Sequence, residues 1–278
     1  MYIIEVLKAV LFGVVEGITE WLPISSTGHL IILENILDVK ASYNGELWSL
    51  FLVVIQLGAI LAVVTVFFYD LSPIKKDKEK RLDIYKLWLK IGVAIIPSVI
   101  LGLLFDDYLE SKLYNAVGTA TALFFYGIVF IVLEIYDKKR KAKRKEISDI
   151  SFKDAFIIGL FQALSLIPGT SRSGITIIGG MLLLYTRGAA ARFSFYLSIP
   201  TMLGASMLKL FKFYLAGGVL ARLDIYFILI GAVTAYIVSL FVVRLLLSFV
   251  KNHDLKGFGY YRIIFGTIIL LLYLNNII

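Results

Sequence analysis

Residues 16–30, with the sequence EGITEWLPISSTGHL, gather several reactive side chains within an otherwise apolar N-terminal stretch. Glu16 and Glu20 are four residues apart, so they share one face of a helix. Ser26 and His29 are three apart and lie on one side of the helix that follows Pro23. A hydroxyl, an imidazole and a carboxylate are the components of an activated nucleophile. Two neighbouring carboxylates either share a divalent cation or act in acid–base chemistry.

A second polar stretch, residues 168–176 (PGTSRSGIT), contains Arg172. An arginine within an apolar region is expensive and usually functional, and its planar guanidinium matches phosphate oxygens. The hydroxyl residues of both stretches open helices whose free N–H groups favour anions. We therefore expect a phosphate site at which two helix N-termini meet. Its binding residues include Ser25, Thr27, Thr170, Ser171 and Ser173.

The composition requires a membrane to position these groups. The chain is 59% hydrophobic with a mean hydropathy of +0.87. Residues 50–69, 113–133 and 225–243 carry no charge, and roughly 20 such residues cross a bilayer as a helix. The net charge of +8 fits basic cytoplasmic loops better than nucleic-acid binding, which we do not expect. The sequence predicts an all-α integral membrane protein.

Ten helical pieces are expected in a single domain, residues 1–278. Two pairs are short and interrupted by proline, and the other six pieces have the length of crossings. The predicted pieces are 2–21, 25–37, 47–69, 87–105, 113–136, 153–166, 173–185, 189–211, 224–249 and 258–276.

The two interrupted regions resemble each other, so the chain reads as two repeats, about 1–140 and 150–278. Aligning residues 13–28 with 159–174 pairs Gly13 with Gly159 and, after one gap, Ser26 with Ser171. Each repeat has one broken hairpin and three crossings, and an odd number of crossings inverts the second copy. Such inverted repeats place a functional site near the membrane midplane. We expect six transmembrane helices and two re-entrant hairpins in an inverted-topology repeat.

The charge distribution gives an orientation. The regions 70–90, 137–153, 185–192 and 250–262 hold 20 of the 28 Lys and Arg residues, and we place them in the cytoplasm. The connection 106–112 (DDYLESK) is expected to be an acidic outer loop. Small residues such as those of 231–235 (GAVTA) permit close helix contact, so a homodimer is possible without being required.

The two motifs, EGITE-WLPISSTGH and PGTSRSGIT, resemble the signatures of the undecaprenyl-diphosphatase family, integral-membrane phosphatases associated with bacitracin resistance. The likeness covers nearly the whole chain in length and layout. The acidic motif falls on Glu16 and Glu20, and the second motif includes Gly169 and Thr176 as further substrate-binding positions.

The resemblance implies hydrolysis of a C55-type polyprenyl diphosphate to the monophosphate, which recycles the lipid carrier for envelope polysaccharide synthesis. It also implies a plasma-membrane enzyme with an active site toward the outer face and a requirement for Mg²⁺ or Ca²⁺, which we assign to Glu16 and Glu20. Ser26 is our expected nucleophile, helped by His29 and Glu20, with Arg172 on the phosphates. His29 as nucleophile, and attack by water held by the cation, stay open.

A different class of function shares this architecture. Secondary transporters also use inverted repeats with broken helices. A polyprenyl-phosphate flippase would need the anion site and could use the carboxylates as a proton relay, with or without phosphatase activity. Transport has no evident need for a serine nucleophile, so phosphate release separates the two classes.

Overall fold

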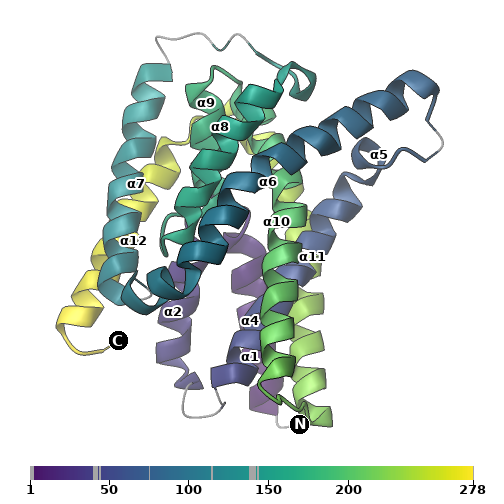
Figure 1. Ribbon diagram of the computed structural model, residues 1–278. Helices are drawn as coiled ribbons and strands as arrows, with labels where there is room; N and C mark the ends of the chain where they lie inside the picture. The colour runs from purple at the N-terminus through teal and green to yellow at the C-terminus, as the bar shows by residue number, and fades with distance from the viewer. Residues whose placement is uncertain are drawn as a thin grey trace.

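The computed structural model describes residues 3–39, 43, 45–74, 76–113, 115–137, 142 and 144–277, and its regular structure there is helical (Figure 1). The longer helices are α1 (Ile3–Thr19), α2 (Ser26–Ile36), α4 (Gly45–Val66), α6 (Lys78–Leu113), α7 (Ala116–Asp137), α8 (Phe152–Ala163), α9 (Arg172–Leu182), α10 (Arg187–Leu215), α11 (Arg222–Asn252) and α12 (Lys256–Leu274). The short elements are α5 (Phe68–Leu71), η1 (Ile147–Asp149) and η2 (Leu164–Leu166).

Five helices of the described residues are long and apolar enough to cross a membrane: α4, α6, α7, α11 and α12. Large apolar side chains stand exposed on them, including Leu103 on α6 and Phe241 on α11, which are 72% and 66% accessible. Such contiguous apolar surface is stable in lipid and not in water. The prediction of an all-helical, multi-pass membrane protein is confirmed.

Helix α6 differs from its predicted bounds of 87–105. It begins at Lys78, continues through Pro97 and ends at Leu113. Residues 106–112, expected to form a loop, therefore belong to the helix. The apolar pattern marks only the part of a helix that faces lipid or protein, so it misses polar turns that extend beyond that part.

The two proline-interrupted pairs enter the bundle from opposite ends (Figure 1). The pair α1–α2 lies at the end that carries both chain termini, and α8–α9 lies at the other end. We call this other end the basic end; it comprises the start of α6, residues 144–151, and the turns 183–186 and 253–255. The breaks of both pairs lie in the middle of the molecule.

A glycine in each interrupted pair lets that pair pack tightly against a long helix. A Cβ on Gly13 of α1 would lie 2.5 Å from the carbonyl oxygen of Gly231 in α11. A Cβ on Gly159 of α8 would lie 2.2 Å from the carbonyl oxygen of Ala94 in α6. Only glycine permits this approach of the backbones. The first pair thus packs on a helix from the second half of the chain, and the second pair on a helix from the first half.

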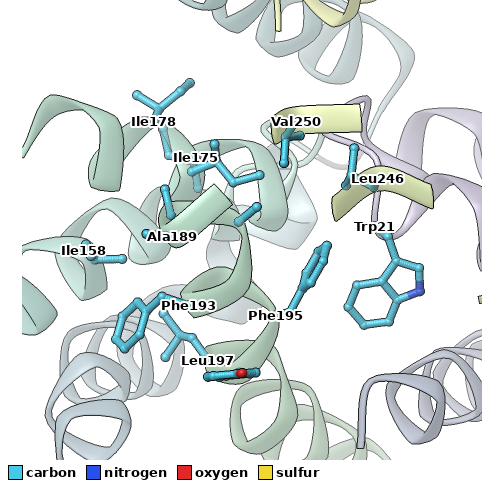
Figure 2. Close-up of a cluster of buried hydrophobic side chains, with 14 of the residues drawn as sticks. Trp21, Ile158, Ile175, Ile178, Ala189, Phe193, Phe195, Leu197, Leu246 and Val250 are labelled. Atoms are coloured by element: carbon cyan, nitrogen blue, oxygen red, sulfur yellow. The ribbon is translucent and has the colours of Figure 1, made fainter. Parts of the chain in front are cut away.

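An apolar core holds α9 between α8, α10 and the end of α11 (Figure 2). Trp21, which follows α1, is fully buried beside this core and packs edge-on against Phe195 of α10, with 5.3 Å between ring centroids. The core thereby fixes both breaks relative to α10. Its labelled members are Trp21, Ile158, Ile175, Ile178, Ala189, Phe193, Phe195, Leu197, Leu246 and Val250.

A polar cluster fastens the start of α8 at the basic end. Asp154 accepts hydrogen bonds from Ser151, Tyr185 and Arg144. Burial alone raises the pKa of Asp154, but the hydrogen bonds from Ser151 and Tyr185 and the charge of Arg144 outweigh it, so this pKa lies below its usual value. Burial raises the pKa of Tyr185 to about 12, so its phenol stays protonated and donates.

Candidate active site

The two helix breaks share an unusual backbone conformation. Ser25, before α2, has φ 71° and ψ 100°, and Ser171, before α9, has φ 70° and ψ 111°. Positive φ in a residue with a side chain costs on the order of 1–3 kcal/mol and concentrates at functional sites. Sequence alignment paired Ser26 with Ser171; the cap geometry instead pairs Ser25 with Ser171. Ser26 therefore corresponds to Arg172, each being the first residue of a half-helix.

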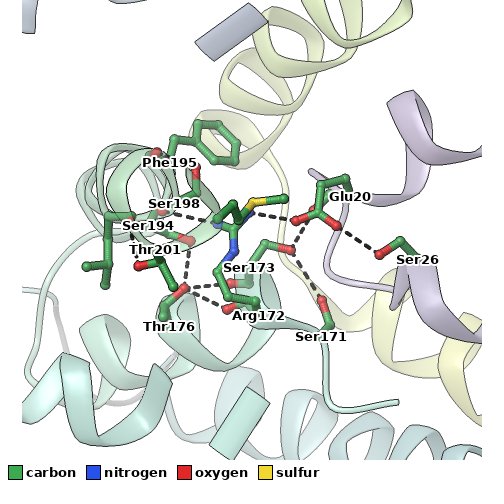
Figure 3. A network of polar contacts seen from close by, with 12 residues as sticks. Glu20, Ser26, Ser171, Arg172, Ser173, Thr176, Ser194, Phe195, Ser198 and Thr201 are labelled. Carbon is green, nitrogen blue, oxygen red and sulfur yellow. Dashed lines mark hydrogen bonds and ion pairs between the residues drawn. The ribbon is translucent and has the colours of Figure 1, made fainter. Parts of the chain in front are cut away.

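Glu20 connects these two first residues (Figure 3). Its Oε2 accepts a hydrogen bond of 2.8 Å from the hydroxyl of Ser26, and its Oε1 accepts one of 2.8 Å from Nη2 of Arg172. Ser173 donates to the backbone carbonyl of Glu20 at 3.1 Å. The carboxylate is 8% exposed, so both hydrogen bonds form in a largely dry place where they are strong. The predicted meeting of the two breaks is confirmed.

Arg172 is held from three sides. Its Nη1 donates to the carbonyl of Ser194 in α10 at 3.2 Å, and its guanidinium lies over the ring of Trp21, 5.6 Å from the centroid. Its Nη2 also lies 3.2 Å from Sδ of Met202. The Nε group is buried and has no hydrogen-bond partner. The guanidinium is therefore fixed in place, and its Nε–H is a donor that no described residue uses.

Glu16 is fully buried, and neither of its carboxylate oxygens has a hydrogen-bond partner. It lies one helical turn before Glu20, whose backbone N–H donates to its carbonyl. An unpartnered buried carboxylate is costly unless a cation or a proton compensates it. The described residues contain no group of three or more His, Cys, Asp and Glu side chains that could hold a metal ion. Proteins commonly bind Mg²⁺ through one or two carboxylates, and the phosphates of the substrate complete its coordination shell. Glu16 and Glu20 fit such a cation.

His29 forms no hydrogen bond with the side chain of Ser26, contrary to expectation. Its Nδ1 lies 2.8 Å from the carbonyl oxygen of Ser25, and its Nε2 lies 2.7 Å from the hydroxyl of Tyr261. Its ring stacks on Phe265 of α12, with 4.0 Å between centroids. A spacing of three residues placed His29 beside the break but could not show that Ser25 would occupy Nδ1 and that Tyr261 of α12 would occupy Nε2. Ser26 has Glu20 as its acceptor instead.

Arg262 is a member of the site that the sequence interpretation missed. It was counted with the cytoplasmic loops, whereas it is fully buried in α12. Its guanidinium donates to the carbonyl of Pro23 at 3.2 Å and to the carbonyls of Gly169 and Thr170 at 2.8 and 2.9 Å. One side chain thus holds both breaks. The sequence did contain a signal for this role, because Arg262 lies within the apolar piece 258–276. A charged side chain in such a piece usually faces the protein interior and has a function.

The remaining second-motif residues mostly hold the break in place. Gly169 has φ +90°, and a Cβ there would lie 2.5 Å from the carbonyl oxygen of Thr119 in α7. Thr176 is buried and lies 2.6 Å from the hydroxyl of Ser194, so it joins α9 to α10. Ser171 caps α9 by accepting from the N–H of Gly174 at 3.2 Å. Thr170 is buried.

Thr27 lines a cavity of about 310 Å³ beside the breaks. Ser165 and Pro168 contribute from the second break, Gln56 from α4, and Lys209 from α10. Gln56 and Lys209 lie far from both motifs in the sequence, so only the fold brings them here. This volume is within the range of small-molecule sites, roughly 300–1,000 Å³.

The chain is similar over nearly its whole length to several undecaprenyl-diphosphatases. Undecaprenyl-diphosphatase of Enterococcus faecalis is 49% identical over 273 residues, which cover 97% of this chain and 97% of the relative. Undecaprenyl-diphosphatase of Streptococcus thermophilus is 49% identical over 271 residues, covering 97% and 93%. Undecaprenyl-diphosphatase of Streptococcus pneumoniae is 47% identical over 276 residues, covering 98% and 97%.

Residues 9–268 also match the family described as bacitracin resistance protein BacA, which covers both breaks and the helices around them. The resemblance first read from the two motifs is thereby confirmed. The chain belongs to the BacA bacitracin-resistance family.

Proposed function

We propose that this protein hydrolyses undecaprenyl diphosphate, or a similar polyprenyl diphosphate, to the monophosphate and inorganic phosphate. The observation that carries the proposal is that Glu20 joins Ser26 and Arg172 where the two half-helices begin. The relatives' shared name, undecaprenyl-diphosphatase, supplies the substrate class. Recycling of the lipid carrier for envelope synthesis follows from that reaction.

The diphosphate would bind between the two half-helix N-termini. Their N–H groups and the Nε of Arg172 offer donors to phosphate oxygens, and positioning with electrostatics dominates phosphoryl transfer. Glu16 and Glu20 would hold a Mg²⁺ or Ca²⁺ ion, which when bound offsets the charge of the diphosphate. Thr27 and Ser173 complete the set of hydroxyls near the breaks.

Ser26 is the nucleophile that the geometry supports best. Its Oγ forms a bond to the terminal phosphorus while the bond to the bridging oxygen breaks, and the polyprenyl monophosphate leaves. The Ser26 proton passes to Glu20, its hydrogen-bond acceptor. Water then attacks the phosphoserine, the bond between phosphorus and Oγ breaks, a proton of the water returns to Ser26, and inorganic phosphate leaves. Glu20 releases the proton that it took from Ser26 to bulk water, which restores the starting state. His29 acts on the loop through Ser25 and is a positioning residue in this scheme.

The protein's arrangement in the membrane is part of the proposal. The crossings are α4, α6, α7, α10, α11 and α12, and the pairs α1–α2 and α8–α9 are re-entrant hairpins of an inverted repeat. The basic end faces the cytoplasm of the plasma membrane, following the positive-inside rule, and the cavity at Thr27 opens toward the outer face. Transport without hydrolysis is not favoured, because transport does not require the hydrogen bond between Ser26 and Glu20.

The direct test is phosphate release from farnesyl diphosphate by detergent-purified protein in Mg²⁺, Ca²⁺ or chelator. We expect release that requires the cation and that is lost in Glu20→Ala and in Arg172→Ala. If purified, folded protein releases no phosphate at any cation concentration, the proposal is wrong.

A further inference from the structure

A second cavity lies at the basic end, and none of its lining residues contributes to the hydrogen bonds around Glu20. It has a volume of about 440 Å³ and is enclosed by residues 145–147, the start of α10 and the last turns of α11. This volume is again typical of a small-molecule site, roughly 300–1,000 Å³. The charged side chains of its wall are Lys145, Glu146, Arg187, Arg192 and Lys251.

One of these cations is already neutralised. Arg187 donates from Nε, at 2.8 Å, and from Nη2 to the two oxygens of Glu134, a fully buried carboxylate of α7. Glu134 also accepts from the backbone N–H of Leu255 at 2.9 Å. This contact joins α7, α10 and the start of α12, so the position of Arg187 is structural and the cavity wall is rigid there.

The other three cations are not neutralised. Within the ranges that the structure describes, Lys145, Arg192 and Lys251 form no ion pair with a carboxylate. Among the described residues of the wall, Glu146 is the one acidic side chain, so these three cations face one anion. Arg192 is half-buried, and the cost of holding its charge away from water falls when an anion enters.

The rest of the wall suits an amphiphilic anion. The first turn of α10 adds the positive end of a 29-residue helix, with Thr186 as its cap. Ile147, Ala189, Leu247 and Val250 form an apolar lining. Cationic groups beside apolar surface at the end of a membrane bundle are the setting in which lipid phosphates bind.

We propose that this cavity binds a phosphate group, free or as the headgroup of an anionic lipid, at a site distinct from the hydrolytic centre. Arg192 provides a planar fork for two phosphate oxygens, and Lys145 and Lys251 provide point charges. The apolar lining holds the first carbons of the lipid when the phosphate belongs to one. The proposal does not depend on hydrolysis at Glu20.

The absence of cysteine from the chain gives a site-specific test. Gly188 lies in the cavity wall, and a Cβ there would meet only Lys251, at 3.9 Å, so Gly188→Cys introduces a thiol without a clash. Gly257→Cys is a matched control at the same end, where a Cβ meets nothing within 4 Å. The rate of thiol alkylation by N-ethylmaleimide is measured in dodecylmaltoside micelles alone, with added inorganic phosphate, and with added phosphatidylglycerol.

The alkylation rate of Gly188→Cys should be proportional to the fraction of sites that remain empty. It should therefore fall about tenfold when the anion concentration is about ten times its Kd. Gly257→Cys should keep its rate. Protection by inorganic phosphate identifies a free-anion site, and protection by phosphatidylglycerol alone identifies a lipid-headgroup site. When Arg192→Gln and Lys251→Gln are added to Gly188→Cys, the anions should no longer slow alkylation. Each variant is compared with its own rate in the absence of anion.

Two results would overturn the proposal: an unchanged Gly188→Cys rate with both anions, or equal protection after the two charges are removed. Retained phosphatidylglycerol, measured by native mass spectrometry of cysteine-free protein, provides an independent readout. It should fall in Arg192→Gln/Lys251→Gln and persist in Arg81→Gln/Lys86→Gln, a control with the same charge change on the start of α6. Phosphate release by each variant confirms that it is folded.

Discussion

Glu20 and Arg172 lie 152 positions apart in the chain and meet at 2.8 Å between Oε1 and Nη2. The contact joins the end of one broken helix to the start of another, and the same carboxylate also holds Ser26. Each half of the chain therefore provides a part that does not work alone: the first half carries the acceptor and hydroxyl, and the second half carries the cation. Arg262 of α12 reinforces this meeting from behind through three backbone carbonyls.

Replacing Arg262 by Met should separate the two breaks. Three buried carbonyls would lose their donor, at a cost of about 2–5 kcal/mol for the group. We expect a lower Tm in detergent and a kcat for farnesyl diphosphate reduced at least about tenfold. Arg262→Lys should recover part of the activity, because an ammonium can still donate but lacks the planar fork. Equal kcat values for wild type and Arg262→Met would show that Arg262 does not position the site.

Glu16→Gln should reveal whether the unpartnered carboxylate holds a cation. In wild-type protein Mg²⁺ should raise Tm, because it binds the folded state. In Glu16→Gln the shift should shrink, and Tm in chelator should rise because a buried charge has been removed. Glu46→Gln on α4 is the control and should keep the wild-type shift. An identical Mg²⁺ response in Glu16→Gln and wild type would remove Glu16 from the cation site.

Ser26→Ala tests the nucleophile. Loss of a nucleophile from a unit of interacting groups should lower kcat on the order of 10⁴-fold or more. Loss of a hydrogen bond alone costs about tenfold. Acid quench during turnover followed by peptide mass spectrometry should find phosphate on Ser26. A modest loss of rate and an unmodified Ser26 would favour attack by water.

Asp154→Asn should destabilise the start of α8 in a pH-dependent way. A carboxylate whose pKa is lowered by folding stabilises the protein above its unfolded pKa, about 3.9, and this contribution disappears as the pH falls through the folded pKa. The Tm difference between wild type and Asp154→Asn should therefore be largest near pH 7. It should shrink as the pH falls below about 4 and disappear once Asp154 is protonated in the folded protein. A difference that is constant from pH 7 to pH 3 would contradict this assignment.

Much of the fold followed from periodicity and length. Apolar runs located the long helices, and Pro23 and Pro168 located the two breaks, because a helix interior rejects proline and irregular backbone needs a protein-lined place in a membrane. The bounds of α6 were wrong because its polar turns carry no apolar pattern. The conformation shared by Ser25 and Ser171 could not be read from side-chain identity, so the alignment of the breaks was displaced by one residue.

Within the site, the sequence predicted which groups gather but not which atoms pair. Glu20, Ser26 and Arg172 were placed together because each borders a break. Tyr261 and Phe265, which contact the ring of His29, come from α12, so their position depends on how α12 packs against α2. Arg262 was misplaced for the same reason, since a charge near the end of an apolar run can face either water or protein. Whether such a side chain faces water or protein depends on packing between helices that are distant in the sequence. The residues next to it in the sequence do not determine that packing.

A double-mutant cycle between Glu20 and Arg172 tests the central claim most directly. The kcat for phosphate release is measured for Glu20→Gln, Arg172→Gln and the double variant, with unfolding curves confirming that each is folded. If the pair acts as one unit, each single variant loses at least about 10²-fold and the double variant is no worse than the poorer single. Near-wild-type turnover in either single variant, or losses that add fully in the double variant, would contradict a hydrolytic centre built on this contact.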